Sequence, residues 1–123
     1  MDVALVRLER REAILTEIWD WFDDVGSSLR SLDAKREALA DRLAREFGGA
    51  EGWRIRCLFV VRRTRRNAKL LQELRALFAA RFPGSSVAWL RALGDPAAPL
   101  PDRDGLLWST STYRLQASRV GRA

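Results

Sequence analysis

The alternation of apolar and polar residues along the chain predicts strands first. Residues 2–8 (DVALVRL) and 13–20 (AILTEIWD) have the composition of strands, and the polar segment 9–12 between them suits a hairpin turn. Residues 53–63 (WRIRCLFVVRR) contain an unbroken apolar run at 57–61. Such a run is typical of a strand buried on both faces, so we expect it at the centre of a sheet.

Two helical patterns follow these strands. In the first, Asp24 or Ser27 is suited to cap the start and Gly48-Gly49 to end the helix. In the second, Asn67 is the expected cap and Pro83 follows the last apolar residue. The apolar positions recur at helical spacing. They are Leu29, Leu32, Leu39, Leu43 and Phe47 in the first helix, and Leu70, Leu71, Leu74, Leu77, Phe78 and Phe82 in the second.

The last third of the chain predicts further strands. Residues 86–93 (SVAWLRAL) read as a fourth strand, 94–105 as a loop with three prolines, 106–118 as a last strand or hairpin, and 119–123 as a frayed tail. The order β-β-α-β-α-β predicts an α/β domain: a mixed sheet of about four to five strands with two main helices packed on it.

The chain has 123 residues, of which 47% are apolar, enough for one domain with a core. We expect residues 2–93 to form the core of this domain and residues 94–118 to complete it. No apolar run approaches the ~20 residues that cross a bilayer, and the N-terminus lacks a signal pattern. We therefore expect a cytoplasmic protein that does not bind a membrane. The first strand begins directly after Met1, which suggests a fragment or a gene start assigned too late.

Composition excludes several kinds of site. The chain has no histidine and one cysteine, which rules out Ser-His-Asp triads, histidine-ligated metals and thiolate zinc sites. Cys57 lies within an apolar run and is expected to be a small buried hydrophobe. Chemistry is left to carboxylates, Lys, Arg, Ser, Thr and the single Tyr113. The net charge of +6 favours a polyanionic partner, nucleic acid first, or serves solubility alone.

Two acids are candidates for a metal site. Asp2 lies fifteen residues before Glu17, and a turn between their strands would place the two carboxylates side by side. Two carboxylates on a sheet can hold Mg²⁺, which prefers oxygen ligands. The alternative is that Glu17 pairs with Arg54 or Arg56 of the neighbouring strand. Nearby Asp20, Asp23 and Asp24 are expected to serve the helix N-terminus rather than a metal cluster.

The spacing from Asp2 to "EIW" at 17–19, followed by "DDVGSSLRSLDAKREAL" and "WRIRCLFVVRRTRRN", resembles the PD-(D/E)XK, or restriction-endonuclease-like, superfamily. The nearer resemblance is to the nuclease-like domain behind lambda-repressor-type helix-turn-helix modules in actinobacterial regulators. It implies a core that lacks its first helix and its upstream DNA-binding module. It also implies that Asp2 and Glu17 are the catalytic, metal-binding acids and that Trp19 occupies the position of the catalytic lysine.

Replacement of that lysine by Trp19 is the main departure from the resembled motif. The helix after the second strand carries Arg30 and Lys35 as substitute cations, although Lys35 is far enough into the helix to point outward. Arginine stays protonated and cannot act as a base. We therefore expect a non-catalytic domain without a cofactor, or with Mg²⁺ if it is catalytic.

A cluster of five cations falls within eight residues where the central strand ends and the second helix begins: Arg62, Arg63, Arg65, Arg66 and Lys69. Strand ends and helix N-termini of this kind often bind phosphate. The alternative is a solvated loop. Of the five tryptophans, Trp21 and Trp108 are the least suited to the interior and could mark a partner surface.

Three functions follow from these observations. The first is a degenerate nuclease-like accessory domain of a DNA-binding transcriptional regulator, with phosphate contact through the cluster at 62–69. The second is a Mg²⁺-dependent DNA endonuclease domain that uses Asp2 and Glu17. The third is a homodimerisation module that uses the exposed sheet edge and Trp21.

Overall fold

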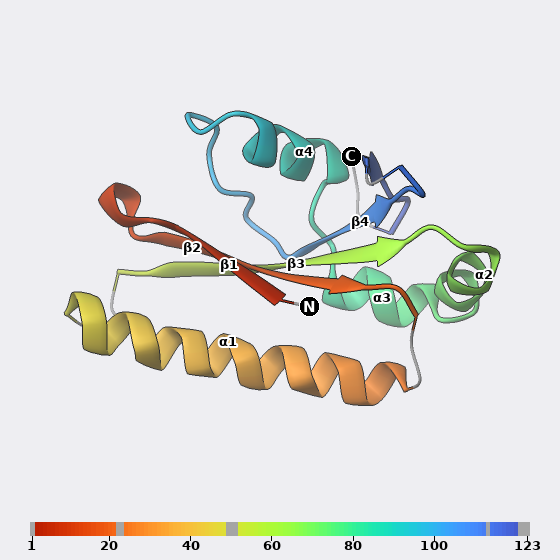
Figure 1. The fold of residues 1–123 in the computed structure, drawn as a ribbon, viewed down its shortest axis with the longest axis horizontal. Helices are drawn as coiled ribbons and strands as arrows, with labels where there is room; N and C mark the ends of the chain where they lie inside the picture. The colour runs from red at the N-terminus through yellow and green to blue at the C-terminus, as the bar shows by residue number, and fades with distance from the viewer. Residues whose placement is uncertain (1, 22–23, 49–51, 113, 121–123) are drawn as a thin grey trace.

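The computed structural model describes residues 2–21, 24–48, 52–112 and 114–120. These residues form a mixed sheet with helices on both faces (Figure 1). The strands are β1 (Asp2–Arg7), β2 (Glu12–Trp19), β3 (Arg54–Arg62), β4 (Gly105–Ser109) and β5 (Leu115–Ala117). The helices are α1 (Val25–Phe47), α2 (Arg65–Glu73), α3 (Arg75–Arg81) and α4 (Ser86–Gly94), with the 3-10 turn η1 (Leu8–Arg10).

The strands stand in the sheet in the same order as in the chain, β1-β2-β3-β4-β5. β2, β3 and β4 run parallel, and the outer strands β1 and β5 are antiparallel to their neighbours. The predicted mixed α/β sheet is therefore confirmed, and β3 is its central strand as the unbroken apolar run indicates. The C-terminal segment forms the hairpin alternative, with β4 and β5 paired.

Two apolar cores lie on opposite faces of the sheet. On one face, α1 and α3 pack over a cluster that contains Phe59, Phe78 and Phe82 (Figure 1). On the other face, α4 buries Trp89 against Leu58 and its neighbours. Because side chains alternate along a strand, odd-numbered residues of β2 and β3 face α1 and even-numbered residues face α4.

The ends of α1 follow the predicted capping. The Asp24 side chain accepts a hydrogen bond from the Ser27 N–H at 3.1 Å, and Gly48 ends the helix in the left-handed region with φ 79°. The expected cap at Asn67 is wrong. Thr64 caps α2, and Asn67 is the residue whose N–H bonds the Thr64 hydroxyl. Thr64 comes three residues earlier, which is the spacing of a side-chain cap and its N–H partner.

The predicted second helix is divided into α2 and α3 at Leu74, so the residues that the structure describes form four α-helices rather than two. The predicted fourth strand at 86–93 is wrong, because this segment is the helix α4. Ser85 caps it by accepting from the Ala88 N–H at 3.2 Å. Its buried positions, Ser86, Trp89 and Ala92, are each three residues apart, which is a helical and not a strand spacing.

The C-terminal segment is ordered further than the sequence predicts. Val120 packs against the α1-side core, so position 120 is not part of a frayed tail, and 121–123 fall outside the described residues. Gly49, Asp23 and Tyr113 also fall outside them. Among the described helices, none has the length and apolarity to span a membrane.

Candidate functional site

The hairpin of β1 and β2 brings the two predicted acids together. Asp2 and Glu17 are directly opposite each other in the antiparallel register, which places their side chains on the same face of the sheet. That face is the one covered by α1, because Glu17 is an odd-numbered residue of β2 between Leu15 and Trp19 of the α1-side core. Asp2 lies at the outer strand of the sheet and is half exposed, whereas Glu17 lies inward and is buried.

Lys35 of α1 joins this pair. Its Nζ lies 2.7 Å from Glu17 Oε1 and 3.9 Å from Asp2 Oδ1. The Glu17 side chain is 2% exposed and that of Lys35 is 35% exposed. Lys35 therefore points toward the sheet, not outward, and places an ammonium group at both carboxylates. We refer to Asp2, Glu17 and Lys35 as the acid–lysine site.

The spacing of residues along α1 indicates this orientation of Lys35. Lys35 lies three residues after Leu32 and four before Leu39, so it shares the inward face of α1 with them. The same periodicity applies to Arg36, four residues after Leu32. The outward orientation expected for Lys35 is therefore wrong, and Arg36 is a second cation on the inward side that the apolar pattern does not indicate.

The second oxygen of Glu17, Oε2, is buried and has no hydrogen-bond partner among the described residues. A buried carboxylate oxygen usually has a partner, and leaving one without a partner is costly. A cation or a water at this position would satisfy it. The donor set, two carboxylates that share one face, fits Mg²⁺, which binds through one or two carboxylates and keeps waters or substrate oxygens. Within the described ranges, no three His, Cys, Asp or Glu side chains gather to form a fuller metal cage.

Trp19, which the resemblance aligns with a catalytic lysine, is part of the α1-side core. Its ring meets Phe59 edge-on, with 6.2 Å between centroids and 72° between planes. It shares the face of Glu17, since the two are separated by one residue on β2. The indole thus fills apolar space next to the acids and contributes packing there.

The alternative partners of Glu17 have other contacts. Arg54 pairs with the buried Glu12, which also lies 3.5 Å from Arg7. Arg56 donates to the Pro101 carbonyl at 3.1 Å. Both arginines are even-numbered residues of β3 and face away from Glu17, so the pairing of Glu17 with Arg54 or Arg56 is wrong.

The acids between β2 and α1 serve local structure where they are described. Asp24 caps α1, and Asp20 lies 3.7 Å from Arg62. Beside them, a hollow of about 500 Å³ extends along the start of α1. It is lined by Ile18, Trp19, Asp20, Trp21, Asp24, Ser27, Ser28 and Ser31. Ser31 is one helical turn before Lys35, but none of Asp2, Glu17 and Lys35 lines this hollow.

The predicted arginine cluster lies at the C-terminal end of β3 and the first turn of α2. Arg63 donates to Gln116 at 2.8 Å, and Lys69 lies 3.9 Å from Glu73. Arg65 and Arg66 are exposed on α2. The cluster and the acid–lysine site are on different elements, and no contact between them is observed among the described residues.

A polar group that the sequence did not predict connects α1 with β3. Arg36 donates to Cys57 Sγ at 3.1 Å and pairs with Asp104, whose other oxygen accepts from the Cys57 N–H at 2.8 Å. Burial raises the pKa of the Cys57 thiol to about 11, and Arg36 offsets this only in part. The thiol is therefore neutral near pH 7 and is not a nucleophile, as the expectation of a buried hydrophobe requires.

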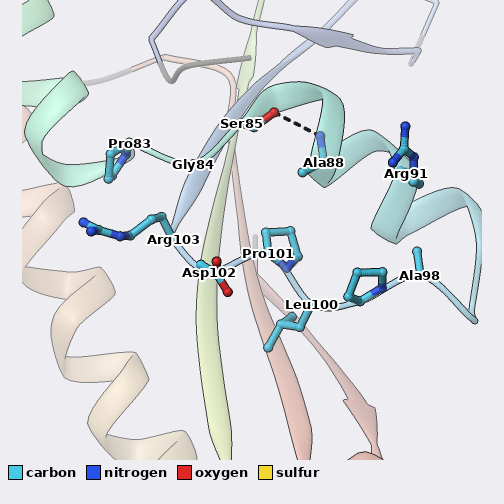
Figure 2. Close-up of a pocket in the computed structure, with 11 residues that line it drawn as sticks. Pro83, Gly84, Ser85, Ala88, Arg91, Ala98, Leu100, Pro101, Asp102 and Arg103 are labelled. Carbon is cyan, nitrogen blue, oxygen red and sulfur yellow. Dashed lines mark hydrogen bonds between the residues drawn. The ribbon is translucent and has the colours of Figure 1, made fainter.

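Another pocket, of about 440 Å³, lies on the α4 side of the sheet between α4 and the proline-containing loop (Figure 2). Pro101 and Leu100 of the loop lie across from Ala88 of α4, while Arg91 and Arg103 lie at opposite ends. None of the predicted site residues lines it. It is built by main-chain turns and prolines and presents no convergent set of acids or bases.

Comparisons of the chain with protein-family models, with curated proteins and with solved structures found no match. A function for this protein must therefore be inferred from the arrangement of its own residues.

Proposed function

We propose that this domain hydrolyses phosphodiester bonds of nucleic acid with Mg²⁺ at the acid–lysine site. The observation that carries the proposal is the convergence of Asp2, Glu17 and Lys35. The two acids are directly opposite on paired strands, and Lys35 Nζ lies 2.7 Å from Glu17. The buried Glu17 Oε2, without a described partner, supports a cation at the same place.

The residues of the chain have separate tasks in this proposal. Asp2 and Glu17 would hold the ion, which when bound activates water and stabilises negative charge on a phosphate. Asp2 is 51% exposed, so a polymer substrate can reach the site from the edge of the sheet. Lys35 supplies positive charge for the phosphate oxygens as charge develops on them.

The reaction itself is a displacement at phosphorus. A water oxygen forms the new bond to phosphorus, and the P–O bond to the leaving sugar oxygen breaks. The proton that the water loses and the proton that the leaving oxygen gains are exchanged with solvent. Such a reaction depends mainly on positioning and on electrostatic stabilisation, and the acids and the lysine of this site are suited to both.

The resemblance to the PD-(D/E)XK superfamily supports this proposal at two acids and departs from it at Trp19. In the proposal Lys35, from a helix instead of the strand, takes over the charge of the missing lysine. The expectation of a non-catalytic domain took Lys35 to point outward, and its position at both acids supports the catalytic alternative instead.

The second candidate is the degenerate, non-catalytic accessory domain of a DNA-binding regulator. A specific observation favours it: Lys35 already lies within ion-pair distance of both acids, so it can neutralise them in place of a metal ion. Phosphate contact would then pass through Arg62, Arg63, Arg65, Arg66 and Lys69. In this candidate a helix-turn-helix module or a second copy of the chain is the partner.

A cleavage assay separates the two candidates. Supercoiled plasmid and end-labelled single-stranded oligonucleotides are incubated with the protein and Mg²⁺ or Mn²⁺. We expect cleavage that is lost with EDTA and reduced at least about a hundredfold in Glu17→Gln and Lys35→Ala. Glu37→Gln, an exposed position on α1, is the matched control and should cleave like the parent.

The outcomes of this assay are distinct. Absence of metal-dependent cleavage by a folded protein overturns the hydrolytic proposal and leaves the accessory domain. Cleavage that survives Glu17→Gln points to a contaminating nuclease and also overturns it. Partial activity in Lys35→Arg, with none in Lys35→Ala, would support a role for the charge of Lys35.

A further inference from the structure

The carboxyl edge of the three parallel strands gathers tryptophan and arginine side chains. Trp21 follows the end of β2, Arg63 follows the end of β3, and Trp108 is the fourth residue of β4. Because β2, β3 and β4 run parallel, their carboxyl ends meet at the same edge of the sheet, where ligands of open α/β sheets tend to bind. In Figure 1, β3 runs toward α2 at this edge.

Two arginines of the cluster lie over the two indoles. The guanidinium carbon of Arg66 is 5.4 Å from the centroid of the Trp21 ring, and that of Arg63 is 5.9 Å from the Trp108 ring. Stacking holds the planar guanidinium against an aromatic face while its N–H groups remain directed outward at the edges. The 51% exposed Trp21 leaves much of its surface to solvent.

The backbone below this surface is held by a buried side chain. Asn67 is fully buried, and its Nδ2 donates to the Asp20 carbonyl at 2.7 Å and to the Arg62 carbonyl at 2.9 Å. One residue of α2 therefore ties the end of β2 to the end of β3. Trp21 directly follows Asp20 and Arg66 directly precedes Asn67, so this link restrains the backbone beside both, which lowers the entropy that binding must overcome.

The charge on this surface is positive after its own ion pairs are considered. Among its five cations, Arg62 lies near Asp20 and Lys69 near Glu73. Arg63 bonds the neutral Gln116, and Arg65 is exposed. With Asp24 of the adjoining hollow included, the acids described here are fewer than the five cations, which favours attraction of a polyanion.

We infer that this edge binds single-stranded nucleic acid, with a base stacked on Trp21 and phosphates on Arg63, Arg65 and Arg66. Aromatic side chains interleaved with arginines bind single strands because an unpaired base offers its flat face. A base inside a duplex is covered on both faces, so an exposed indole gains nothing from duplex. The inference names a substrate class for the proposed hydrolysis but concerns binding, and it holds if no bond is cut.

The hollow beside α1 adjoins this surface at Trp21. Trp21 and Ser31 are both in its lining, and Ser31 is one turn before Lys35. The two acids in the hollow are engaged, Asp20 near Arg62 and Asp24 with the Ser27 N–H.

Fluorescence anisotropy with labelled dT12, U12 and a 12-base-pair duplex tests this inference. In EDTA, so that nothing is cut, we expect either single strand to bind at least about tenfold more tightly than the duplex. Trp21→Ala and Arg66→Ala should each weaken single-strand binding about tenfold. Arg91→Ala is the control, because it removes one exposed cation on the distant helix α4. It should change the affinity for single strands about twofold at most.

Equal or tighter binding of duplex would overturn the inference, as would unchanged affinity in a Trp21→Ala protein whose circular dichroism matches the parent. Trp21→Phe keeps a stacking ring and should recover much of the affinity. Glu17→Gln serves to separate this inference from the proposed hydrolysis, because it should abolish cleavage and leave the binding of dT12 unchanged. Loss of both in Glu17→Gln would place the strand at the acids instead of at Trp21, and would also overturn the inference.

Discussion

At the scale of single residues, Glu17 and Lys35 show how strongly burial couples two charges. Glu17 is 2% exposed, and a carboxylate taken out of water is costly unless a partner compensates it. Lys35 is that partner at 2.7 Å, while 35% exposure of its own side chain weakens the interaction through solvent screening. Removing one member of the pair should therefore cost more than removing both.

We predict that Lys35→Ala lowers the free energy of unfolding by about 1–3 kcal/mol, because it leaves the Glu17 charge buried without its ammonium partner. The double variant Lys35→Ala/Glu17→Gln should regain a large part of this loss. Urea unfolding of the parent, the two single variants and the double variant gives the coupling directly. Additive effects of the two changes would contradict the prediction.

The Cys57 thiol should make stability fall at alkaline pH. Its pKa is raised to about 11 in the folded protein by burial. In the unfolded chain a thiol titrates near its ordinary value, about 8.5. Between these values the unfolded chain loses its proton while the folded protein keeps it, so the free energy of unfolding decreases as pH rises.

We expect this contribution to reach about 3 kcal/mol by pH 11. The measurement is the difference in free energy of unfolding between the parent and Cys57→Ala at pH 8 and pH 10.5. The free energy of unfolding of the parent should fall relative to that of Cys57→Ala at the higher pH. A constant difference would show that the thiol titrates alike in both states.

At the scale of elements, α4 is fitted to β4 through one glycine. A methyl group added at Gly105 would lie 2.2 Å from Cδ1 of Trp89. Trp89 is fully buried, and its Nε1 donates to the Arg103 carbonyl at 3.0 Å. The strand and the helix can approach so closely only because residue 105 has no side chain.

We predict that Gly105→Ala destabilises the protein by about 1–3 kcal/mol, since the fixed indole cannot move aside without losing its hydrogen bond. Gly94→Ala is the matched control, because a methyl group there meets nothing within 4 Å. It should leave the melting temperature unchanged or raise it. Thermal unfolding of both variants checks the prediction, and equal melting temperatures would contradict it.

Elements also show how far the sequence predicts the fold. Long strands with marked patterns, such as β2 and β3, and the capping of α1 by Asp24 are local features and follow from the sequence. The segment of α4 predicts a strand from its composition, because eight residues with Val and Trp fit either period. What settles the helix is the Ser85 cap and the contact of Trp89 with β4, and the second of these is a tertiary feature.

At the scale of the whole molecule, the candidate site was predictable only in part. The turn between β1 and β2 predicts that Asp2 and Glu17 approach each other, and the register bears out this juxtaposition. The place of Lys35 depends on how α1 packs across the sheet, and the Trp21–Arg66 stack depends on where α2 begins. Both are set by contacts between segments distant in sequence, which local pattern does not encode.

The order of the strands in the sheet, β1 to β5, is the order in which they are synthesised. Each strand that leaves the ribosome thus finds the edge it needs already formed, and no late strand must insert between two early ones. The hairpin of β1 and β2 comes first, and the parallel β3 adds after the 23 residues of α1. Assembly during synthesis can therefore proceed by simple extension, with little need to undo an earlier pairing.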